Sequence, residues 1–210
     1  MTANARRPRQ RWSVLGAVLA AGAGSRFGAP KADLVVDGER LLDRAIATLG
    51  AGGCDHVVAV VRPGTAADRA DRVRLLVNED PDRGQRSSLE IAVAAAGPDA
   101  CEVLIVVLVD TPGLDPAAVR SVLGAWRPGR IVVGCYDGRR GHPVAMAPEL
   151  WRQAVEAAGP DEGAKRFLGA HPELVDEVAV SGERTDIDTP ADLARWQVSR
   201  TSRTPGTRPD

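Results

Sequence analysis

The sequence lacks the residues on which disulfide frameworks, structural zinc sites and membrane spans depend. Its 210 residues include 3 cysteines and 3 histidines, with no CxxC pair and no two histidines at i, i+4 spacing. We therefore interpret Cys54, Cys101 and Cys135 as reduced thiols and expect no zinc site. No stretch reaches the roughly 18 consecutive apolar residues of a spanning helix, so no membrane association is expected.

The net charge of the chain is small, and lysine is rare in it. The formal net charge is −1, which gives no sign of nucleic acid or an anionic membrane surface as a partner. Only two of the 27 basic residues are lysines, Lys31 and Lys165. This preference for arginine, together with abundant alanine, indicates a bias in codon usage. An individual arginine therefore carries little functional information, and the two lysines stand out.

Both ends of the chain differ in composition from the middle. Residues 1–12 and Ser199–Asp210 are polar and rich in proline and arginine, which predicts a disordered arm and tail around a single domain over 13–198. The arginines of the arm precede an apolar run, Val14–Ala21, as in a signal peptide. That run is only about eight residues long and leads into a glycine loop, so a buried first strand explains it equally well. A cytoplasmic location is expected.

Short β-branched runs alternate with helical patterns between these ends. Strands are predicted over Val14–Ala20, His56–Val61, Val73–Val77, Val103–Val109, Ile131–Cys135, Pro143–Ala147 and Glu177–Val180. Helices are predicted over 41–49, Leu89–Ala96 and Glu149–Ala158, after the N-cap Asp115, and after the capping box that Thr189 and Asp192 form. This alternation predicts a Rossmann-like, three-layer α/β/α domain with a mainly parallel sheet, whose ligands bind beyond the carboxyl ends of the strands.

The first predicted strand leads directly into a loop of small residues, LAAGAGSRFGAPK, which runs from Leu19 to Lys31. Small residues let backbone N–H groups approach a phosphate closely, and such loops form anion-binding concavities. The loop also carries two cations, Arg26 and Lys31. Such a pair could straddle a polyphosphate and neutralise charge on both sides of the bond that breaks. The plainer alternative is that both are ordinary solvated surface residues.

Two better-known glycine motifs fit this loop less well. A Walker A loop needs Gly-Lys-Ser/Thr and then a helix, whereas Lys31 follows proline and precedes a strand and a turn. A dinucleotide fingerprint needs GxGxxG at the start of a helix, which the glycines 22, 24 and 28 do not provide. An NADP-binding fold remains an alternative because Arg62, at the end of the second predicted strand, stands where such a fold can place its 2′-phosphate contact.

The stretch LAAGAGSRFGAPKADL resembles the signature LAAGxSxRMGxxKxLL of the MobA-like nucleotidyltransferases. It is most similar to the branch that transfers cytidylyl groups to the molybdenum cofactor. Guanylyl-transferring relatives typically read LAGG and have aspartate before the lysine, where this chain has Ala21 and Pro30. The resemblance recurs over roughly residues 14–196. It implies a nucleotide-diphospho-sugar transferase (GT-A-like) fold. The nucleotide-binding residues that it implies are Leu19, Ala20, Ala21, Gly22, Gly24 and Ser25.

A second loop, from Asn78 to Leu89, resembles the family's Asn-Pro…Gly-x-Ser-Ser-Leu loop. The resemblance implies that Asn78 and Ser88 help to enclose the nucleotide. From the local sequence alone, Ser87 or Ser88 would equally serve as an N-cap for the helix that follows. Capping and substrate contact are compatible.

Two further segments resemble the acceptor side of the family's site. Gly141-His142-Pro143 matches a Gly-His-Pro segment, although a single histidine in a turn is commonly structural. Gly159–Lys165 is similar to a Gly-Asp-x-Gly-Ala-Arg element, with Pro160 inserted and lysine in place of the arginine. Asp161 is expected to cap a short helix that has Lys165 in its first turn. The resemblance implies that His142 and Lys165 bind the acceptor.

Two aspartates are predicted to bind a metal ion. Asp110 follows a buried strand, where a carboxylate is well placed for Mg²⁺, a hard cation that takes oxygen ligands. The next residue, Thr111, departs from the family's usual Asp-Gln-Pro. Downstream, Thr185–Pro190 matches an Asp-Ile-Asp-Thr-Pro motif, and strand alternation would put Asp186 and Asp188 on one face. Asp188 is predicted to be the second metal ligand, with Asp186 as the alternative.

Together these residues predict a Mg²⁺-dependent nucleotidyltransferase with Arg26, Lys31 and Asp110 as catalytic residues. An acceptor phosphate oxygen attacks the α-phosphorus of a nucleoside triphosphate and pyrophosphate leaves, with no base required. The resemblance implies CTP as donor and molybdopterin or its metal-loaded form as the phosphate-bearing acceptor. It also implies a molybdoenzyme, or the chaperone of one, as a protein partner. One alternative is a sugar-1-phosphate nucleotidyltransferase. The other is a non-catalytic cofactor-binding chaperone, and such a chaperone would need no metal-binding carboxylates.

Overall fold

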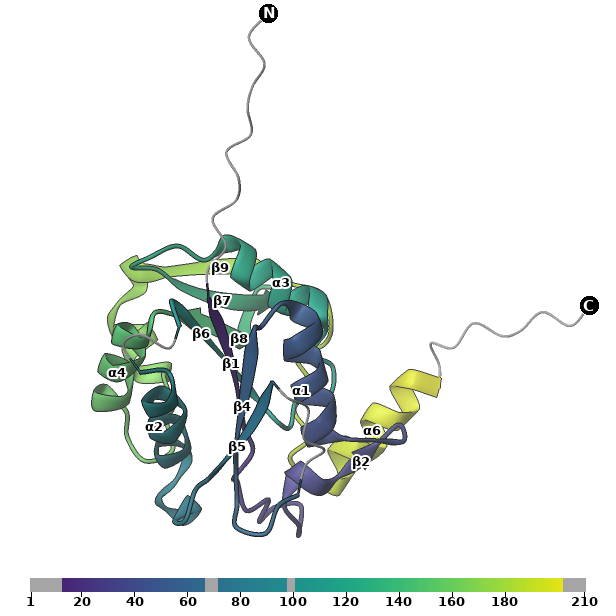
Figure 1. Ribbon diagram of the computed structural model, residues 1–210. Helices are drawn as coiled ribbons and strands as arrows, with labels where there is room; N and C mark the ends of the chain where they lie inside the picture. The colour runs from purple at the N-terminus through teal and green to yellow at the C-terminus, as the bar shows by residue number, and fades with distance from the viewer. Residues whose placement is uncertain (1–12, 67–71, 98–100, 202–210) are drawn as a thin grey trace, which may run out of the picture.

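A seven-stranded sheet forms the middle layer of the molecule in the computed structural model, which describes residues 13–66, 72–97 and 101–201 (Figure 1). The strand order is β5-β4-β1-β6-β8-β7-β9, and β8 is antiparallel to both of its neighbours while the other adjacent pairs are parallel. The strands are β1 (Val14–Leu19), β4 (His56–Val61), β5 (Val73–Val77), β6 (Val103–Leu108), β7 (Ile131–Tyr136), β8 (Arg139–Met146) and β9 (Val175–Ala179). The expected mainly parallel sheet is confirmed.

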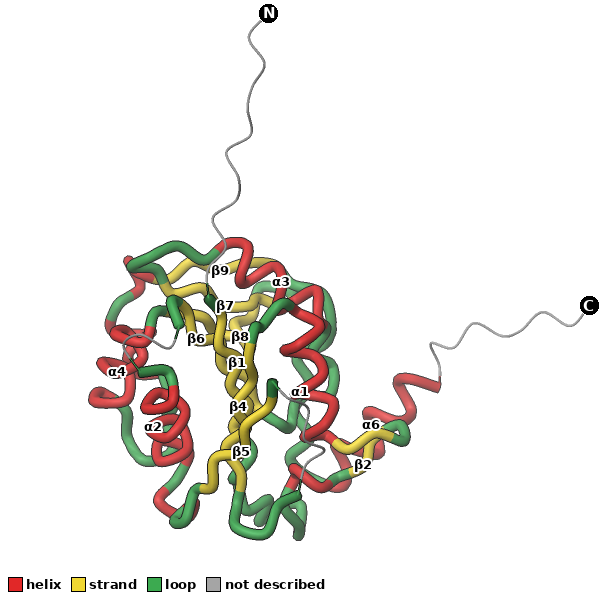
Figure 2. The backbone as a smooth tube through the Cα atoms, viewed as in Figure 1, coloured by secondary structure: helices red, strands yellow, loops and turns green. Residues whose placement is uncertain are grey.

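Helices cover both faces of this sheet, so the predicted three layers are confirmed (Figure 2). One face carries α1 (Leu41–Gly52) and α3 (Pro116–Ala125), and the other carries α2 (Gln85–Ala95), α4 (Pro148–Ala157) and α5 (Lys165–Ala170). The helix α6 (Pro190–Thr201) lies beside the small hairpin of β2 (Val35–Val36) and β3 (Glu39–Arg40). Three 3-10 turns complete the described elements: η1 (Lys31–Asp33), η2 (Pro81–Arg83) and η3 (Pro172–Leu174).

The central strands are apolar on both sides because each face of the sheet has its own core. Along β1, Val14 and Val18 pack with α1 and α3, whereas Leu15 and Leu19 pack with α2 and α4. Gly16 lies between them, and a Cβ atom there would come within 2.9 Å of Cys54 Sγ. All three cysteines are free, and burial raises the pKa of the Cys54 thiol to about 12. No helix in the described residues is long and apolar enough to cross a membrane.

Several element ends follow the predicted local chemistry. Gly53 ends α1 in the left-handed region at φ 109°, and the Asp115 carboxylate accepts the Ala117 N–H at 2.6 Å to cap α3. Before α6, the Asp192 carboxylate accepts the Thr189 N–H at 2.7 Å, and Thr189 Oγ1 accepts the Asp192 N–H at 3.2 Å. This reciprocal pair confirms the predicted capping box.

The last helix extends slightly past the predicted end of the domain. The helix α6 runs to Thr201, three residues beyond the predicted boundary at residue 198: Ser199 is helical, and its hydroxyl donates to the Trp196 carbonyl oxygen at 2.8 Å. The capped first turn and the buried Trp196 support a helix that polar composition alone does not reveal. The expected arm over 1–12 and the rest of the tail lie outside the described residues.

The antiparallel strand β8 was only half predicted. It begins at Arg139, four residues before the expected start at Pro143, because β7 and β8 form a two-residue hairpin. The connecting residues Asp137 and Gly138 both have positive φ values, 48° and 76°, as such a tight turn requires. His142 therefore lies within a strand rather than in a turn.

Candidate nucleotide and acceptor site

The glycine loop leaves the carboxyl end of β1 and folds back on itself. The backbone N–H groups of Phe27 and Gly28 both donate to the Gly24 carbonyl oxygen at 2.8 Å. Gly24 has a φ of +61°, and a Cβ atom on it would lie 1.9 Å from the Ala29 carbonyl oxygen. Only glycine fits at this position. Gly22 and Ser25 are exposed, whereas Leu19, Ala20 and Ala21 at the start of the loop are buried.

Two acidic residues are fixed beside this loop. Asp110 follows β6, which is hydrogen-bonded to β1 in the sheet. The fully buried Ile187 donates its N–H to the Asp110 carbonyl oxygen at 2.9 Å, which places the next residue, Asp188, near the end of β6. The capping box holds Asp188 from its other side, because the Asp188 N–H donates to the Asp192 carboxylate at 3.1 Å.

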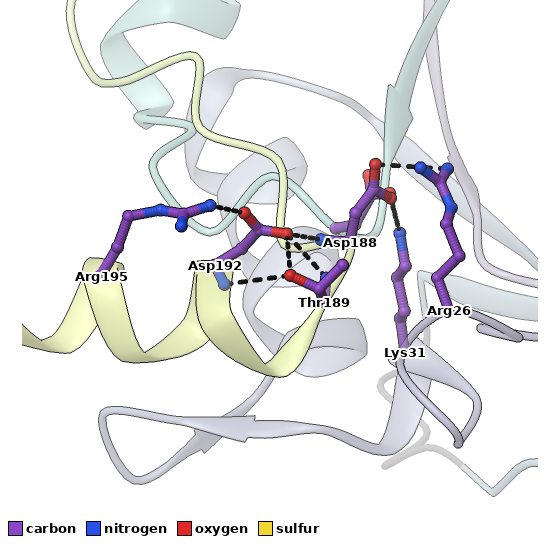
Figure 3. A network of polar contacts seen from close by, with 7 residues as sticks. Arg26, Lys31, Asp188, Thr189, Asp192 and Arg195 are labelled. Carbon is purple, nitrogen blue, oxygen red and sulfur yellow. Dashed lines mark hydrogen bonds and ion pairs between the residues drawn. The ribbon is translucent and has the colours of Figure 1, made fainter.

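Four predicted site residues from three distant parts of the chain meet here. Figure 3 labels three of them, Arg26, Lys31 and Asp188. Lys31 Nζ lies 2.7 Å from Asp110 Oδ2 and 2.5 Å from Asp188 Oδ1. Arg26 Nη2 lies 3.3 Å from the other oxygen of Asp188, Oδ2. Although burial acts to lower it, the pKa of Lys31 is raised, because the two carboxylates outweigh burial. The cluster therefore holds a charged lysine between two carboxylates.

The two carboxylates fit a divalent ion that takes only some of its ligands from the protein. Asp110 and Asp188 converge on one cationic group, and Asp110 Oδ1 is buried with no hydrogen-bond partner among the described residues. No group of three or more His, Cys, Asp or Glu side chains in the described part of the chain could hold a metal ion. Mg²⁺ and similar hard cations are commonly held by one or two carboxylates, with water and substrate phosphates completing the coordination.

The structure separates the two aspartates of the Asp-Ile-Asp motif. The segment 183–188 is not a strand, so the alternation that would put both on one face does not apply. Asp188 shares Lys31 with Asp110, whereas Asp186 lines the neighbouring cavity. Partial burial, followed by the negative charge of Asp110, raises the pKa of Asp186. The geometry favours Asp188 as the partner of Asp110.

Asn78 and Ser88 are buried and hydrogen-bonded to each other. They are 3% and 5% exposed, and Asn78 Nδ2 donates to Ser87 Oγ at 2.8 Å and to Ser88 Oγ at 3.1 Å. The helix α2 begins at Gln85 with Gly84 at its N-cap, so neither serine is the N-cap and that expectation is wrong. The positive φ of Gly84 lets the helix start earlier, and the serines lie in its first turn.

A cavity of about 1010 Å³ opens beside the carboxylates. His142 and Lys165 both line it, so the two predicted acceptor residues are brought to one place. Its walls combine aliphatic side chains, Leu89 and Leu108 among them, with polar and charged ones. Sequence reasoning missed the lining residues Arg140 and Arg184. In a chain with so many arginines, neither position carried a signal that sets it apart, although Arg140 precedes the Gly-His-Pro segment.

The imidazole of His142 has one fixed orientation. Its Nδ1 lies 3.2 Å from the Val106 carbonyl oxygen, and because a carbonyl can only accept, Nδ1 carries the proton. Burial lowers the pKa of His142, so the ring is neutral near pH 7 and Nε2 keeps its lone pair. The Tyr136 hydroxyl donates to the His142 carbonyl oxygen at 2.7 Å and fixes the backbone.

Lys165 opens α5, as predicted, but Asp161 does not cap that helix. Ala164 is the N-cap and makes no side-chain bond. The loop before α5 instead packs on the start of α2, where a Cβ atom on Gly84 would lie 2.5 Å from Asp161 Oδ1. Arg86 ties the two segments together, because its backbone N–H donates to the Pro160 carbonyl oxygen at 2.9 Å.

Arg62 contacts the start of the glycine loop. Its Nη1 donates to the Ala21 carbonyl oxygen at 3.2 Å and lies 3.4 Å from Asp82 Oδ1. The arginine therefore lies at the carboxyl end of β4, where the sequence predicted it, and is held by protein groups.

A glycine loop above paired carboxylates, at the carboxyl edge of a mainly parallel sheet, defines a nucleotide-binding α/β protein equipped for phosphoryl chemistry. The family described as the MobA-like NTP transferase domain matches residues 16–197, and the chain belongs to this family. It is a nucleotidyltransferase by family membership. The predicted resemblance, fold and enzyme class are confirmed.

Two relatives align with most of the chain. Nicotine blue oxidoreductase from Paenarthrobacter nicotinovorans is 37% identical over 196 residues, which span 87% of this chain and 95% of that protein. Molybdenum cofactor guanylyltransferase from Acidiphilium cryptum is 33% identical over 195 residues, 87% of this chain and 93% of that protein.

Solved structures share the fold over a similar length. Rv0371c from Mycobacterium tuberculosis has a TM-score of 0.76 at 26% identity, with 88% of this chain and 97% of that chain covered. A structure of Rv0371c in complex with manganese has a TM-score of 0.72 at 25% identity, with 89% of this chain and 99% of that chain covered. Divalent metal use is therefore plausible for this family.

Proposed function

We propose that the protein transfers a nucleoside monophosphate from a nucleoside triphosphate to a phosphate-bearing small molecule and releases pyrophosphate. The observation that carries this proposal is the convergence of Arg26, Lys31, Asp110 and Asp188 beside the glycine loop. Two cations and two carboxylates at the carboxyl edge of β1 and β6 suit a reaction in which phosphate charge must be positioned and neutralised.

Each part of the site has a role in this proposal. The glycine loop, from the buried Leu19 to the exposed Ser25, binds the triphosphate. The buried Asn78 and Ser88, which are hydrogen-bonded to each other, help to enclose the nucleotide. Arg26 and Lys31 stabilise charge on the departing pyrophosphate. Asp110 and Asp188 would hold Mg²⁺, which supplies charge neutralisation on the phosphates when it is bound. An acceptor phosphate oxygen forms the new bond to the α-phosphorus as the bond to the β-phosphate oxygen breaks.

The cavity beside the carboxylates is the proposed acceptor site. Lys165 at its rim supplies a cation for an acceptor phosphate, and His142 offers an unprotonated Nε2 as a hydrogen-bond acceptor. A phosphate monoester is already nucleophilic near neutral pH, so His142 positions the acceptor and is not required as a base.

CTP and molybdopterin, or its metal-loaded form, are the proposed donor and acceptor. Ala21 and Pro30 favour CTP, because guanylyl-transferring relatives typically have glycine and aspartate there. The relative named molybdenum cofactor guanylyltransferase supports a molybdenum-cofactor acceptor. A molybdoenzyme or its chaperone is the proposed recipient of the product.

Pyrophosphate release tests this proposal. Purified protein is incubated with Mg²⁺ and CTP, GTP or ATP, each with and without molybdopterin or a sugar 1-phosphate. Release that requires both CTP and molybdopterin supports the proposal, and release with a sugar 1-phosphate supports the sugar-nucleotide alternative. A protein that binds molybdopterin and releases no pyrophosphate with any pair is a carrier.

A second candidate function is nicotinamide-dependent reduction. Two observations favour it: the relative named nicotine blue oxidoreductase and the position of Arg62 at the carboxyl end of β4. Fluorescence titration with NADPH tests it, with Arg62→Met as the matched variant. Tight binding that the variant loses supports a redox function, and no binding excludes a nicotinamide cofactor.

A cytoplasmic location is proposed on structural grounds. The apolar run that resembles a signal peptide forms β1, the central strand between β4 and β6. Cleavage after this run would remove that strand from the sheet. A reporter fused after residue 25 tests the proposal: it stays in the cytoplasm, whereas export with cleavage would contradict it.

A further inference from the structure

Lys31 occupies the point on which two carboxylates converge. Its Nζ contacts one oxygen of Asp110 at 2.7 Å and one of Asp188 at 2.5 Å, and the lysine and Asp110 side chains are only 15% and 17% exposed. The second oxygen of Asp110 is buried without a hydrogen-bond partner in the part of the chain that the structure describes. An ammonium group therefore holds the position where these carboxylates would bind a divalent ion.

We propose that Lys31 holds the cation position in the nucleotide-free protein, and that a divalent ion binds there only after a triphosphate draws the lysine away. This inference rests on the proposed nucleotidyl transfer. An ammonium group and a divalent ion cannot share the same carboxylate oxygens, because both the space and the positive charges conflict. Phosphate oxygens offer the ammonium group an equally strong charge-assisted partner. Metal and nucleotide would then bind together, and metal alone would bind weakly.

The local structure lets the side chain move while its backbone stays in place. Lys31 begins η1, and the next residue, Ala32, is 1% exposed within the core. The Lys31 carbonyl oxygen also accepts the Leu34 N–H at 3.1 Å. The lysine can therefore exchange partners by rotating its side chain about a fixed backbone.

Arg26 provides a matched comparison. It carries the same charge on the same loop and contacts Asp188, but it contacts the other oxygen, Oδ2, at 3.3 Å and is 73% exposed. Arg26 therefore does not occupy the shared position between the carboxylates. Its removal lowers the local positive charge without opening that position.

Nucleotide-free protein is titrated with Mn²⁺, and the free ion is measured by electron paramagnetic resonance. This titration distinguishes the opening of the cation position from a simple loss of local positive charge. Lys31→Met should bind Mn²⁺ at least about tenfold more tightly than wild type, whereas Arg26→Met should change the affinity less than about threefold. The double variant with Lys31→Met and Asp110→Asn should lose this increase in Mn²⁺ affinity. Equal affinities in wild type and Lys31→Met, or an equal gain in both single variants, would overturn the inference.

The scarcity of lysine allows a test without any substitution. Protein labelled with ¹³C at the lysine ε-carbon gives signals from only Lys31 and Lys165. The Lys31 signal should shift on addition of Mg²⁺ with a non-hydrolysable CTP analogue, and much less with the same concentration of Mg²⁺ alone. An unchanged Lys31 signal in a protein that releases pyrophosphate contradicts this inference alone. No pyrophosphate release, with the Mn²⁺ gain in Lys31→Met intact, contradicts the proposed function and leaves the competition standing.

Discussion

Asp110 is the residue on which the proposed chemistry most depends. It contacts Lys31, and its second carboxylate oxygen is buried. We expect Asp110→Asn to lower pyrophosphate release by at least about 100-fold, because removal of one group that stabilises transition-state charge commonly has this effect. Circular dichroism should show an unchanged fold. The control is Asp176→Asn, which removes a carboxylate on β9 that is paired with Arg130. This variant should keep its activity.

His142 should make the stability of the domain sensitive to acid. Burial holds its pKa below the ordinary 6.5. As pH falls below about 6.5, the unfolded chain binds a proton at this histidine that the folded protein does not bind. The contribution of His142 to the free energy of unfolding is therefore fully present above that pH and is lost below it. Urea unfolding of His142→Asn should therefore show a shallower loss of stability between about pH 7 and 5.5 than wild type.

The matched control for that measurement is His171→Asn, since the His171 side chain is 41% exposed. It should retain the acid slope of the wild-type protein. A wild-type slope in His142→Asn as well would show that the imidazole of His142 does not cause the effect.

At the scale of elements, the capping box of α6 also serves the site. Thr189 and Asp192 bond reciprocally, and the same carboxylate fixes the backbone N–H of Asp188. Thr189→Ala should lower the free energy of unfolding by about 1 kcal/mol, as loss of an N-cap commonly does. It should also reduce activity, because Asp188 loses part of its support. An exposed change just upstream, Ser181→Ala, should do neither; a Thr189→Ala protein with wild-type stability and rate would contradict this account.

The glycine loop offers a similar comparison between neighbouring positions. A methyl group on Gly24 meets the Ala29 carbonyl oxygen, whereas one on Gly22 meets no atom within 4 Å. Gly24→Ala should therefore destabilise the protein by about 2 kcal/mol, the cost of a strained left-handed residue. Gly22→Ala should leave the unfolding midpoint in place. Equal midpoints for the two variants would show that the loop does not need its left-handed turn.

Most elements could be predicted because their signals are local. The predicted strand over His56–Val61 matches β4, because a buried β-branched run has few alternatives, and the predicted strand over Val73–Val77 matches the partly buried edge strand β5. The start of β8 was missed although Asp137-Gly138 is a typical hairpin turn. The serines before Leu89 were misread as caps, because the structure pairs them with Asn78, an interaction the local sequence does not reveal.

At the scale of the whole molecule, the sequence suggested the residues of the candidate site but not their arrangement. Sequence reasoning selected Arg26, Lys31, Asp110 and Asp188, but Lys31 is 79 residues from Asp110 and 157 from Asp188 along the chain. No local pattern encodes contacts over such separations; they follow from the order of β1 and β6 in the sheet and from the Ile187 bond to the end of β6. The lysine between the carboxylates is visible only in the fold.

The cavity was also beyond local sequence reasoning. Its walls come from both the parallel strands and the β7–β8 hairpin, together with the start of α5. His142 and Lys165 were selected separately, and the packing of the loop before α5 on the start of α2 brings them to one cavity. Arg140 and Arg184 join them only through the tertiary structure.

The most direct test of nucleotidyl transfer follows radioactive phosphate from labelled CTP into the products. The protein is incubated with Mg²⁺, molybdopterin and CTP that carries ³²P in either the α or the γ position, and the products are separated. The α label should appear in a molybdopterin–cytidine adduct, and the γ label should appear in pyrophosphate. Transfer of the γ label to the acceptor, or recovery of the α label only in unchanged CTP or free CMP, would contradict the proposed transfer.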